Sequence, residues 1–123
     1  MKSKRNSSPL RNGAMMTNKA LSGLGMAMRA GKLATGDETA LKAVQQGKAF
    51  LVFVATDASE NTKKKYRDKC ATYRVRLVEA FDRYTLGAAI GKADRVIAAV
   101  IDPGFARLIG QQLGNLTEVE NIE

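Results

Sequence analysis

The chain has 123 residues and one cysteine, which suits a single domain in a reducing compartment such as the cytoplasm and excludes an intrachain disulfide. It contains no histidine, which excludes Ser-His-Asp and Cys-His catalysis and leaves no plausible zinc site. The 20 basic residues exceed the 12 acidic ones, and a net charge of +8 predicts a polyanionic partner.

The N-terminal part of the chain changes character near residue 17. Residues 1–16 carry basic side chains among Ser, Asn and Gly with no acidic residue, so we predict a flexible basic arm. A first helix is predicted over 17–30, because apolar residues recur there at helical spacing. Gly23 and Gly25 lower its helix propensity, and we expect close packing against a neighbour to explain them.

Helices and short strands alternate along the rest of the chain. Strands are predicted at 32–35, 49–55, 74–78 and 96–101, helices at 37–46, 60–72 and 82–90, and a last helix is predicted from the pair Asp102-Pro103. The runs 49–55 and 96–101 are apolar without alternation, as in strands covered on both faces. We therefore predict a three-layer α/β/α sandwich over 17–113, a single domain with a small mixed four-stranded sheet. The Glu-rich segment 114–123 is predicted to be a frayed acidic tail. No apolar run reaches the ~20 residues that span a bilayer, so no membrane partner is expected.

The start of the second predicted helix carries the strongest functional signal. Gly36 enters the helix, Asp37, Glu38 and Thr39 line its first turn, and Lys42 follows. Helix N-termini have unpaired N–H groups and a partial positive charge, which favour anions such as phosphate. An alternative remains open, because Glu38 and Lys42 at i, i+4 could form a surface ion pair.

Four short segments, 30–32, 36–47, 57–62 and 86–91, occur in an order and spacing that identify a family. The chain resembles the kink-turn-binding ribosomal proteins of the L7Ae and L30e type, most closely their bacterial YlxQ-like branch, over about 17–113. The resemblance implies a non-catalytic protein of the translation apparatus that binds structured RNA, a kink-turn or ribosomal RNA, with the ribosome as a further partner. It implies no cofactor and no small-molecule substrate, and a cytoplasmic location.

The recognition motif of that family reads Gly-x-Asn-Glu-x-x-Lys, and Gly36 and Lys42 match it here. Glu38 stands at the position of the family's Asn, and Thr39 at that of its Glu. In the family these two side chains reach guanines of sheared G·A pairs. An ionised glutamate cannot donate hydrogen bonds, and threonine is shorter than glutamate. We therefore expect RNA binding that is weaker or differently specific than the family's standard.

The second RNA contact of the family is the loop after a Leu-Gly-x-Ala-x-Gly segment, which here reads Gly91-Lys92-Ala93-Asp94. This loop is short and polar, so we expect a phosphate contact from Lys92 and no apolar packing on RNA. The resemblance thus implies RNA-binding residues at Lys32, Gly36, Asp37, Glu38, Thr39, Lys42, Gly91 and Lys92.

Two other signals favour no separate site. The run 63–65 of three lysines points around a helix and is expected to be a solvated surface. A stacking platform for single-stranded RNA is not expected, because Phe50 looks buried and the tyrosines are scattered. Two alternatives to the RNA-binding protein stay open: a protein-interaction module that kept the fold, and an RNA-binding accessory domain of an RNA-modifying enzyme.

Overall fold

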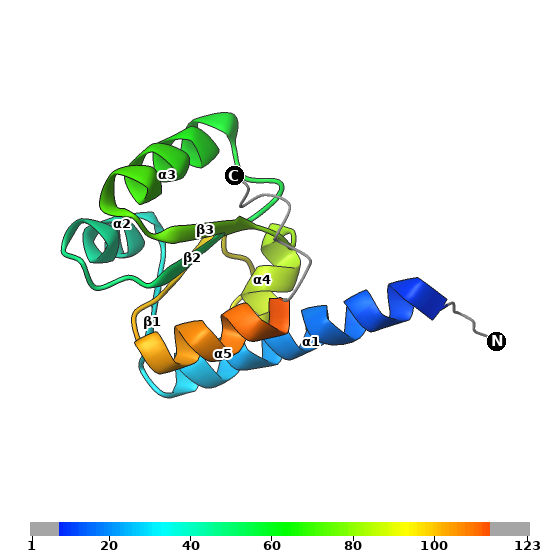
Figure 1. Cartoon of the computed structure of the whole chain (residues 1–123). Coiled ribbons are helices and arrows are strands. Elements are labelled where there is room, and N and C mark those ends of the chain that lie inside the picture. Colours follow the sequence, from blue (N-terminus) through cyan, green and yellow to red (C-terminus); the bar gives the residue numbers. More distant parts are fainter. Residues whose placement is uncertain (1–7, 114–123) are drawn as a thin grey trace.

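The computed structural model describes residues 8–113, with side chains from residue 19 onward (Figure 1). The helices and strands, in chain order, are α1 (Ser8–Arg29), β1 (Leu33–Thr35), α2 (Asp37–Gln45), β2 (Leu51–Val54), α3 (Glu60–Tyr73), β3 (Arg76–Glu79), α4 (Arg83–Ala89), β4 (Ile97–Val100) and α5 (Pro103–Leu113). None of these described helices is both long and apolar enough to cross a membrane.

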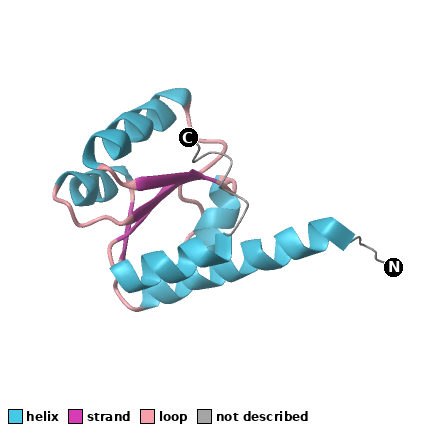
Figure 2. Ribbon diagram, in the orientation of Figure 1, coloured by secondary structure: helices cyan, strands magenta, loops and turns pink. Residues whose placement is uncertain are grey.

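The sheet has the order β1-β4-β2-β3 and is mixed, as predicted. β4 pairs antiparallel with both β1 and β2, whereas β2 and β3 are parallel. Helices α1, α4 and α5 pack against one face of the sheet, and α2 and α3 cover the other (Figures 1 and 2). The three-layer α/β/α sandwich with a small four-stranded sheet is therefore confirmed.

The two central strands have no exposed face. All four residues of β2 and all four of β4 are buried, which confirms the prediction from their uninterrupted apolar runs. Leu51 and Phe53 of β2 pack toward α1, α4 and α5, whereas Val52 and Val54 pack toward α2 and α3. Alternate residues of one strand thus contribute to both cores.

Helix α1 begins at Ser8, well before the predicted start at residue 17, so residues 8–16 of the expected flexible arm are helical. The pair Ser8-Pro9 is a typical helix start, because proline in the first turn needs no N–H partner. This signal was masked by the local abundance of polar residues and glycine. The remainder of the predicted arm, 1–7, and the predicted acidic tail, 114–123, lie outside the described residues.

The aromatic side chains differ in part from expectation. Phe53 is fully buried, but the expectation that Phe50 is buried is wrong, because 45% of it is exposed. Phe50 immediately precedes β2 at the end of the sheet, and its N–H donates to the carbonyl of Val100, the last residue of β4 (2.9 Å). Tyr66 of α3 is fully buried, and Tyr73 at the end of the same helix is 44% exposed.

The two glycines inside α1 lie where neighbouring helices approach it closely. A Cβ atom at Gly23 would lie 2.8 Å from Cγ1 of Ile109 in α5. A Cβ atom at Gly25 would lie 2.7 Å from the carbonyl oxygen of Ala89 at the end of α4. Real Cβ atoms do not approach heavy atoms so closely, so the expectation of close packing is confirmed at both positions.

We expect Gly25→Ala to lower the free energy of unfolding by about 1–3 kcal/mol, because the new methyl group meets backbone that cannot move aside cheaply. This outcome opposes helix propensity, which favours alanine over glycine by about 1 kcal/mol in a helix interior. Urea unfolding followed by circular dichroism measures the change. Ser22→Ala, an exposed position of the same helix, is the control and should change stability by less than about 0.5 kcal/mol. A Gly25→Ala protein as stable as the wild type would contradict the close-packing explanation.

Candidate functional site

The register of the sheet brings three helix starts to one end of the molecule. Thr35 at the end of β1 pairs with Ala98, and Val54 at the end of β2 pairs with Ile97 at the start of β4. Val54 also pairs with Glu79, the last residue of β3. The starts of α2, α3 and α4 and the loop 91–96 before β4 therefore lie at this end, which we call the helix-start end.

Two of these three helix starts are capped by their own side chains. The Ser59 hydroxyl accepts a hydrogen bond from the backbone N–H of Thr62 at the start of α3 (3.1 Å). The Asp82 carboxylate accepts one from the N–H of Thr85 at the start of α4 (2.8 Å), and this bond lowers the pKa of Asp82. Such caps satisfy N–H groups that a helix leaves unpaired.

The start of α2 has no such cap. Its N-cap residue is Gly36, with φ 91° and ψ 149°, and no side chain accepts a hydrogen bond there. The positive φ explains why glycine occupies the position, because other residues rarely adopt that conformation. A Cβ atom at Gly36 would meet nothing within 4 Å, so the space in front of this helix is open to an incoming group. Of the three starts, α2 alone keeps its first-turn N–H groups free of a capping side chain.

Asp37, a predicted RNA-binding residue, is exposed, and its carboxylate contacts two side chains of α3. Its Oδ2 accepts a hydrogen bond from Nζ of Lys65 at 2.7 Å, in an ion pair between α2 and α3. The Tyr66 hydroxyl lies 2.8 Å from Oδ1 and 2.7 Å from the carbonyl oxygen of Asp37, placed to donate to either. The bond from Lys65, assisted by Tyr66, lowers the pKa of Asp37, whereas burial and the bond to Asp37 raise the pKa of Tyr66. Asp37 therefore joins α2 to α3.

Glu38, Thr39 and Lys42 are exposed on α2. Thr39 and Lys42 line a hollow of about 180 Å³ together with Lys48, and the remaining lining residues are Ala34, Ala43, Gln46 and Ile101. Glu38 and Lys42 are both described, and no ion pair joins them, so the alternative of a surface pair is not realised. The Lys42 ammonium is thus available to an anion beside the open start of α2.

The loop that carries Lys92 is held against α4 by backbone contacts. The N–H of Lys92 donates to the carbonyl of Gly87 (2.9 Å), and the N–H of Arg95 donates to that of Arg83 (3.0 Å). A Cβ atom at Gly87 would lie 2.5 Å from Cα of Asp94, so only glycine lets the loop pack here. The Lys92 side chain is exposed, and Gly91 turns the chain with φ 78°.

Lys32 is separated from the other predicted site residues. Its carbonyl accepts a hydrogen bond from the N–H of Ile101, beyond the last residue of β4 (3.0 Å). It precedes β1, whereas Gly36 follows it, so the length of this strand, about 10 Å, lies between them. The structure thus brings the start of α2 and the Lys92 loop to one end of the sheet, and leaves Lys32 at the other end of β1.

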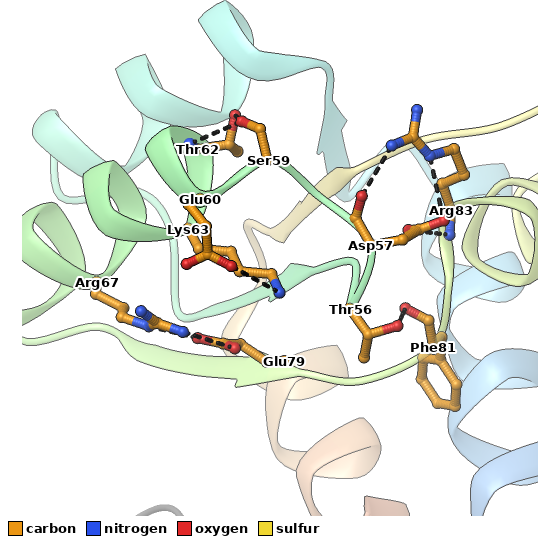
Figure 3. A network of polar contacts seen from close by, with 10 residues as sticks. All are labelled: Thr56, Asp57, Ser59, Glu60, Thr62, Lys63, Arg67, Glu79, Phe81 and Arg83. Carbon is orange, nitrogen blue, oxygen red and sulfur yellow. Dashed lines mark hydrogen bonds and ion pairs between the residues drawn. The ribbon is translucent and has the colours of Figure 1, made fainter.

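An ion pair that the sequence did not suggest holds the helix-start end together (Figure 3). Asp57, before α3, accepts hydrogen bonds from the backbone N–H (2.9 Å) and Nε (3.3 Å) of Arg83 at the start of α4. Nη2 of Arg83 also donates to the carbonyl of Asp57 (2.8 Å). The two residues are 26 positions apart, so no local pattern could pair them. Lys65 was likewise expected only as part of a solvated lysine run, and its contact with Asp37 again depends on two separate helices.

A known protein family matches most of the chain. Residues 18–109 match the ribosomal protein L7Ae/L30e/S12e/Gadd45 family. The chain belongs to this family. The expected resemblance is therefore confirmed.

Two relatives indicate which branch of the family this chain is most similar to. The chain is 47% identical to the RNA-binding protein YlxQ of Enterococcus faecium over 89 aligned residues. The aligned region covers 72% of this chain and 85% of that protein. It is 45% identical to the RNA-binding protein YlxQ of Bacillus subtilis over 83 aligned residues. This aligned region covers 68% of this chain and 83% of that protein. These identities support the YlxQ-like branch.

Two solved structures have the same fold. A Bacillus halodurans protein of unknown function superposes with a TM-score of 0.75 at 45% identity, covering 77% of this chain and 96% of that one. The Giardia lamblia 15.5kD RNA binding protein superposes with a TM-score of 0.69 at 21% identity, covering 80% of this chain and 85% of that one. At this lower identity the likeness concerns the fold alone.

We expect Asp37→Asn to lower the free energy of unfolding at pH 7 by about 1 kcal/mol or less, because asparagine cannot form the partly exposed ion pair with Lys65. The pKa of Asp37 is lowered in the folded state, so its contribution is present above the ordinary carboxyl value near 4 and is lost as pH falls through the folded value. The deficit of the variant should therefore shrink below about pH 4.

Denaturant unfolding of both proteins between pH 7 and pH 3 measures this difference. Glu38→Gln is the matched control, because it removes the same charge from the next residue of α2, where no ion pair exists. A deficit that is independent of pH, or equal in the two variants, would show that the Asp37 carboxylate does not stabilise the helix pair.

Proposed function

We propose that this protein is a non-catalytic RNA-binding protein that engages a structured RNA, either a kink-turn or a ribosomal RNA helix. We place it with the translation apparatus in the cytoplasm. The observation that carries the proposal is the uncapped start of α2, with Lys92 at the same end of the sheet. Lys42 lies on the same helix and takes part in none of the ion pairs among the described residues. The net charge of +8 and the printed names of the YlxQ relatives support RNA as the polyanion.

The helix-start end offers two kinds of contact to such an RNA. The free N–H groups of the first turn of α2 and the partial positive charge there attract a phosphate, and Gly36 lets it approach without a side chain in the way. Lys42 and Lys92 add exposed ammonium groups. Contacts of this kind position a nucleic acid without reading its sequence.

The side chains beside these phosphate contacts bear on specificity. Glu38 and Thr39 are exposed in the first turn of α2, at the positions where the family reads G·A pairs. An ionised Glu38 can only accept hydrogen bonds, and it repels nearby phosphates. We therefore propose that this protein discriminates a kink-turn from a straight duplex less sharply than relatives with Asn and Glu at these positions.

A second candidate function is a protein-interaction module, and one observation favours it. The first turn of α2 carries two carboxylates, those of Asp37 and Glu38, and only Asp37 is paired with a lysine. The remaining negative charge at Glu38 opposes a phosphate and suits a basic partner protein. The RNA-binding measurements below separate the two functions, because a module that lost RNA binding shows no affinity even at low salt.

Lys42→Ala should weaken binding of a kink-turn RNA several-fold and reduce the slope of log affinity against log salt by about 0.7–0.9, the value expected for one lost phosphate contact. Fluorescence anisotropy at several salt concentrations measures both quantities. Lys64→Ala is the control, because Lys64 is an exposed lysine of α3 that pairs with Asp68 on its own helix. If Lys42→Ala and the wild type bind with equal affinity, Lys42 does not contact the RNA. If the affinity is independent of salt, phosphate contacts do not drive binding.

Restoring the family pattern with Glu38→Asn and Thr39→Glu should raise the preference for a kink-turn over a straight duplex by about 1 kcal/mol or more, the scale of one good base contact. The amide of asparagine supplies a donor that Glu38 lacks, and glutamate supplies an acceptor with longer reach than Thr39. Competition between the two RNAs at one salt concentration measures the preference. Full discrimination by the wild type, with no gain in the double variant, would contradict the proposed loss of specificity.

A further inference from the structure

Two exposed aromatic side chains lie at the end of the sheet opposite the helix-start end. Phe50 precedes β2 and is 45% exposed, and Tyr73 is the last residue of α3 and is 44% exposed. In the parallel register of β2 and β3, Leu51 pairs with Arg76, so the residues before these two strands are neighbours across one strand spacing, about 5 Å. The chain segments that carry the two rings therefore meet at this end.

The two rings lie on segments that precede neighbouring strands, Phe50 before β2 and Tyr73 at the end of α3 before β3. The N–H of Phe50 donates to the carbonyl of Val100 (2.9 Å), and the chain bends at Phe50 before it enters β2. Tyr73 follows the buried Tyr66 and Cys70 at helical spacing and so lies on the sheet-facing stripe of α3.

Basic residues surround these rings. Lys48 precedes Phe50, Lys69 lies one helical turn before Tyr73, and Arg74 ends α3 in a left-handed conformation with φ 58°. The ion pairs of the described part of the chain involve none of these three cations. Most other cations of α3 are paired with carboxylates, so this end of the helix keeps a larger unbalanced positive charge.

The same end is continuous with the proposed RNA site along α2. Lys48 lines the hollow that also contains Lys42 and Thr39. The hollow therefore joins Lys42 to Lys48, which is two residues from Phe50 in the chain.

We propose that these five residues, Lys48, Phe50, Lys69, Tyr73 and Arg74, form a second surface that binds single-stranded RNA adjoining the structured RNA. Bases stack on the two rings, and the three cations hold the phosphates between them. Exposed aromatic residues interleaved with basic ones are the general means of binding single strands, because every base offers a stacking face. The choice of RNA as the polyanion rests on the proposed function, whereas the surface itself does not.

The test uses the full chain and two probes, a short labelled oligouridine and a kink-turn RNA without single-stranded ends. The double variant Phe50→Leu with Tyr73→Leu keeps apolar bulk and removes the stacking faces. We expect it to bind oligouridine about tenfold or more weakly than the wild type and to bind the kink-turn RNA equally well. Tyr84→Leu is the control, because Tyr84 is 64% exposed on α4, outside this surface, and its loss should not change oligouridine binding.

A second measurement uses only the wild-type protein, so its result does not depend on whether the double variant folds. An abasic strand of the same length should bind about tenfold or more weakly than oligouridine, because it keeps the phosphates and lacks the stacking bases. Equal binding of the two strands overturns the proposal and identifies a surface for polyanions in general, acidic proteins included. No binding of oligouridine at low salt, or unchanged binding by a folded double variant, overturns it as well.

The two probes keep the two proposals apart. If the kink-turn RNA fails to bind while oligouridine binding depends on the rings, the proposed function fails and this surface stands. If the kink-turn RNA binds through Lys42 while the rings have no effect on oligouridine, the proposed function stands and this surface is refuted.

Discussion

β4 pairs antiparallel with a strand on each side, and this arrangement places every part of the candidate site. Because β1 and β2 both run opposite to β4, their last residues lie beside its first residues. β3 runs parallel to β2 and ends at the same level. The chain then enters α2, α3 and α4 from one end of the sheet, and the loop before β4 returns to that end. The burial of β2 and β4 on both faces makes this register costly to change, since a shift by one residue would turn apolar side chains to the wrong core.

Three helices start at one end of the sheet, and they differ in how their first-turn N–H groups are capped. Ser59 and Asp82 satisfy first-turn N–H groups of α3 and α4, while Gly36 leaves those of α2 without a capping side chain. The ties from Asp37 to Lys65 and Tyr66, and from Asp57 to Arg83, join neighbouring elements across the same end. These contacts hold the open helix start in a defined position. The protein would therefore lose little conformational entropy at this end when it binds an RNA.

The opposite end of the sheet has a different character, because exposed rings and cations outside the ion pairs of the described residues replace helix starts. Phe50 was expected to be buried from its place in an apolar run, and Tyr73 was treated as one of several scattered tyrosines. Whether a ring at the end of a run is covered depends on how far the packed helices extend past the strand, and this distance is a property of the assembled layers. The two rings are 23 positions apart in sequence, and the parallel pairing of β2 with β3 brings their segments together.

The sequence by itself determined the order of elements, the two buried strands, the layered fold and the open glycine at the start of α2. These features depend on local chemistry: apolar runs without alternation, helical periodicity, and a glycine before a helix. Tertiary structure alone decided which predicted site residues lie near one another. It put the length of β1 between Lys32 and the start of α2, bound Asp37 to Lys65 and Tyr66, and joined Asp57 to Arg83. Contacts between residues far apart in the chain depend on strand register and helix packing. It also decided that Gly25 and Gly87 must be glycines, since the carbonyl of Ala89 and the backbone of Asp94 occupy the space that a side chain would need.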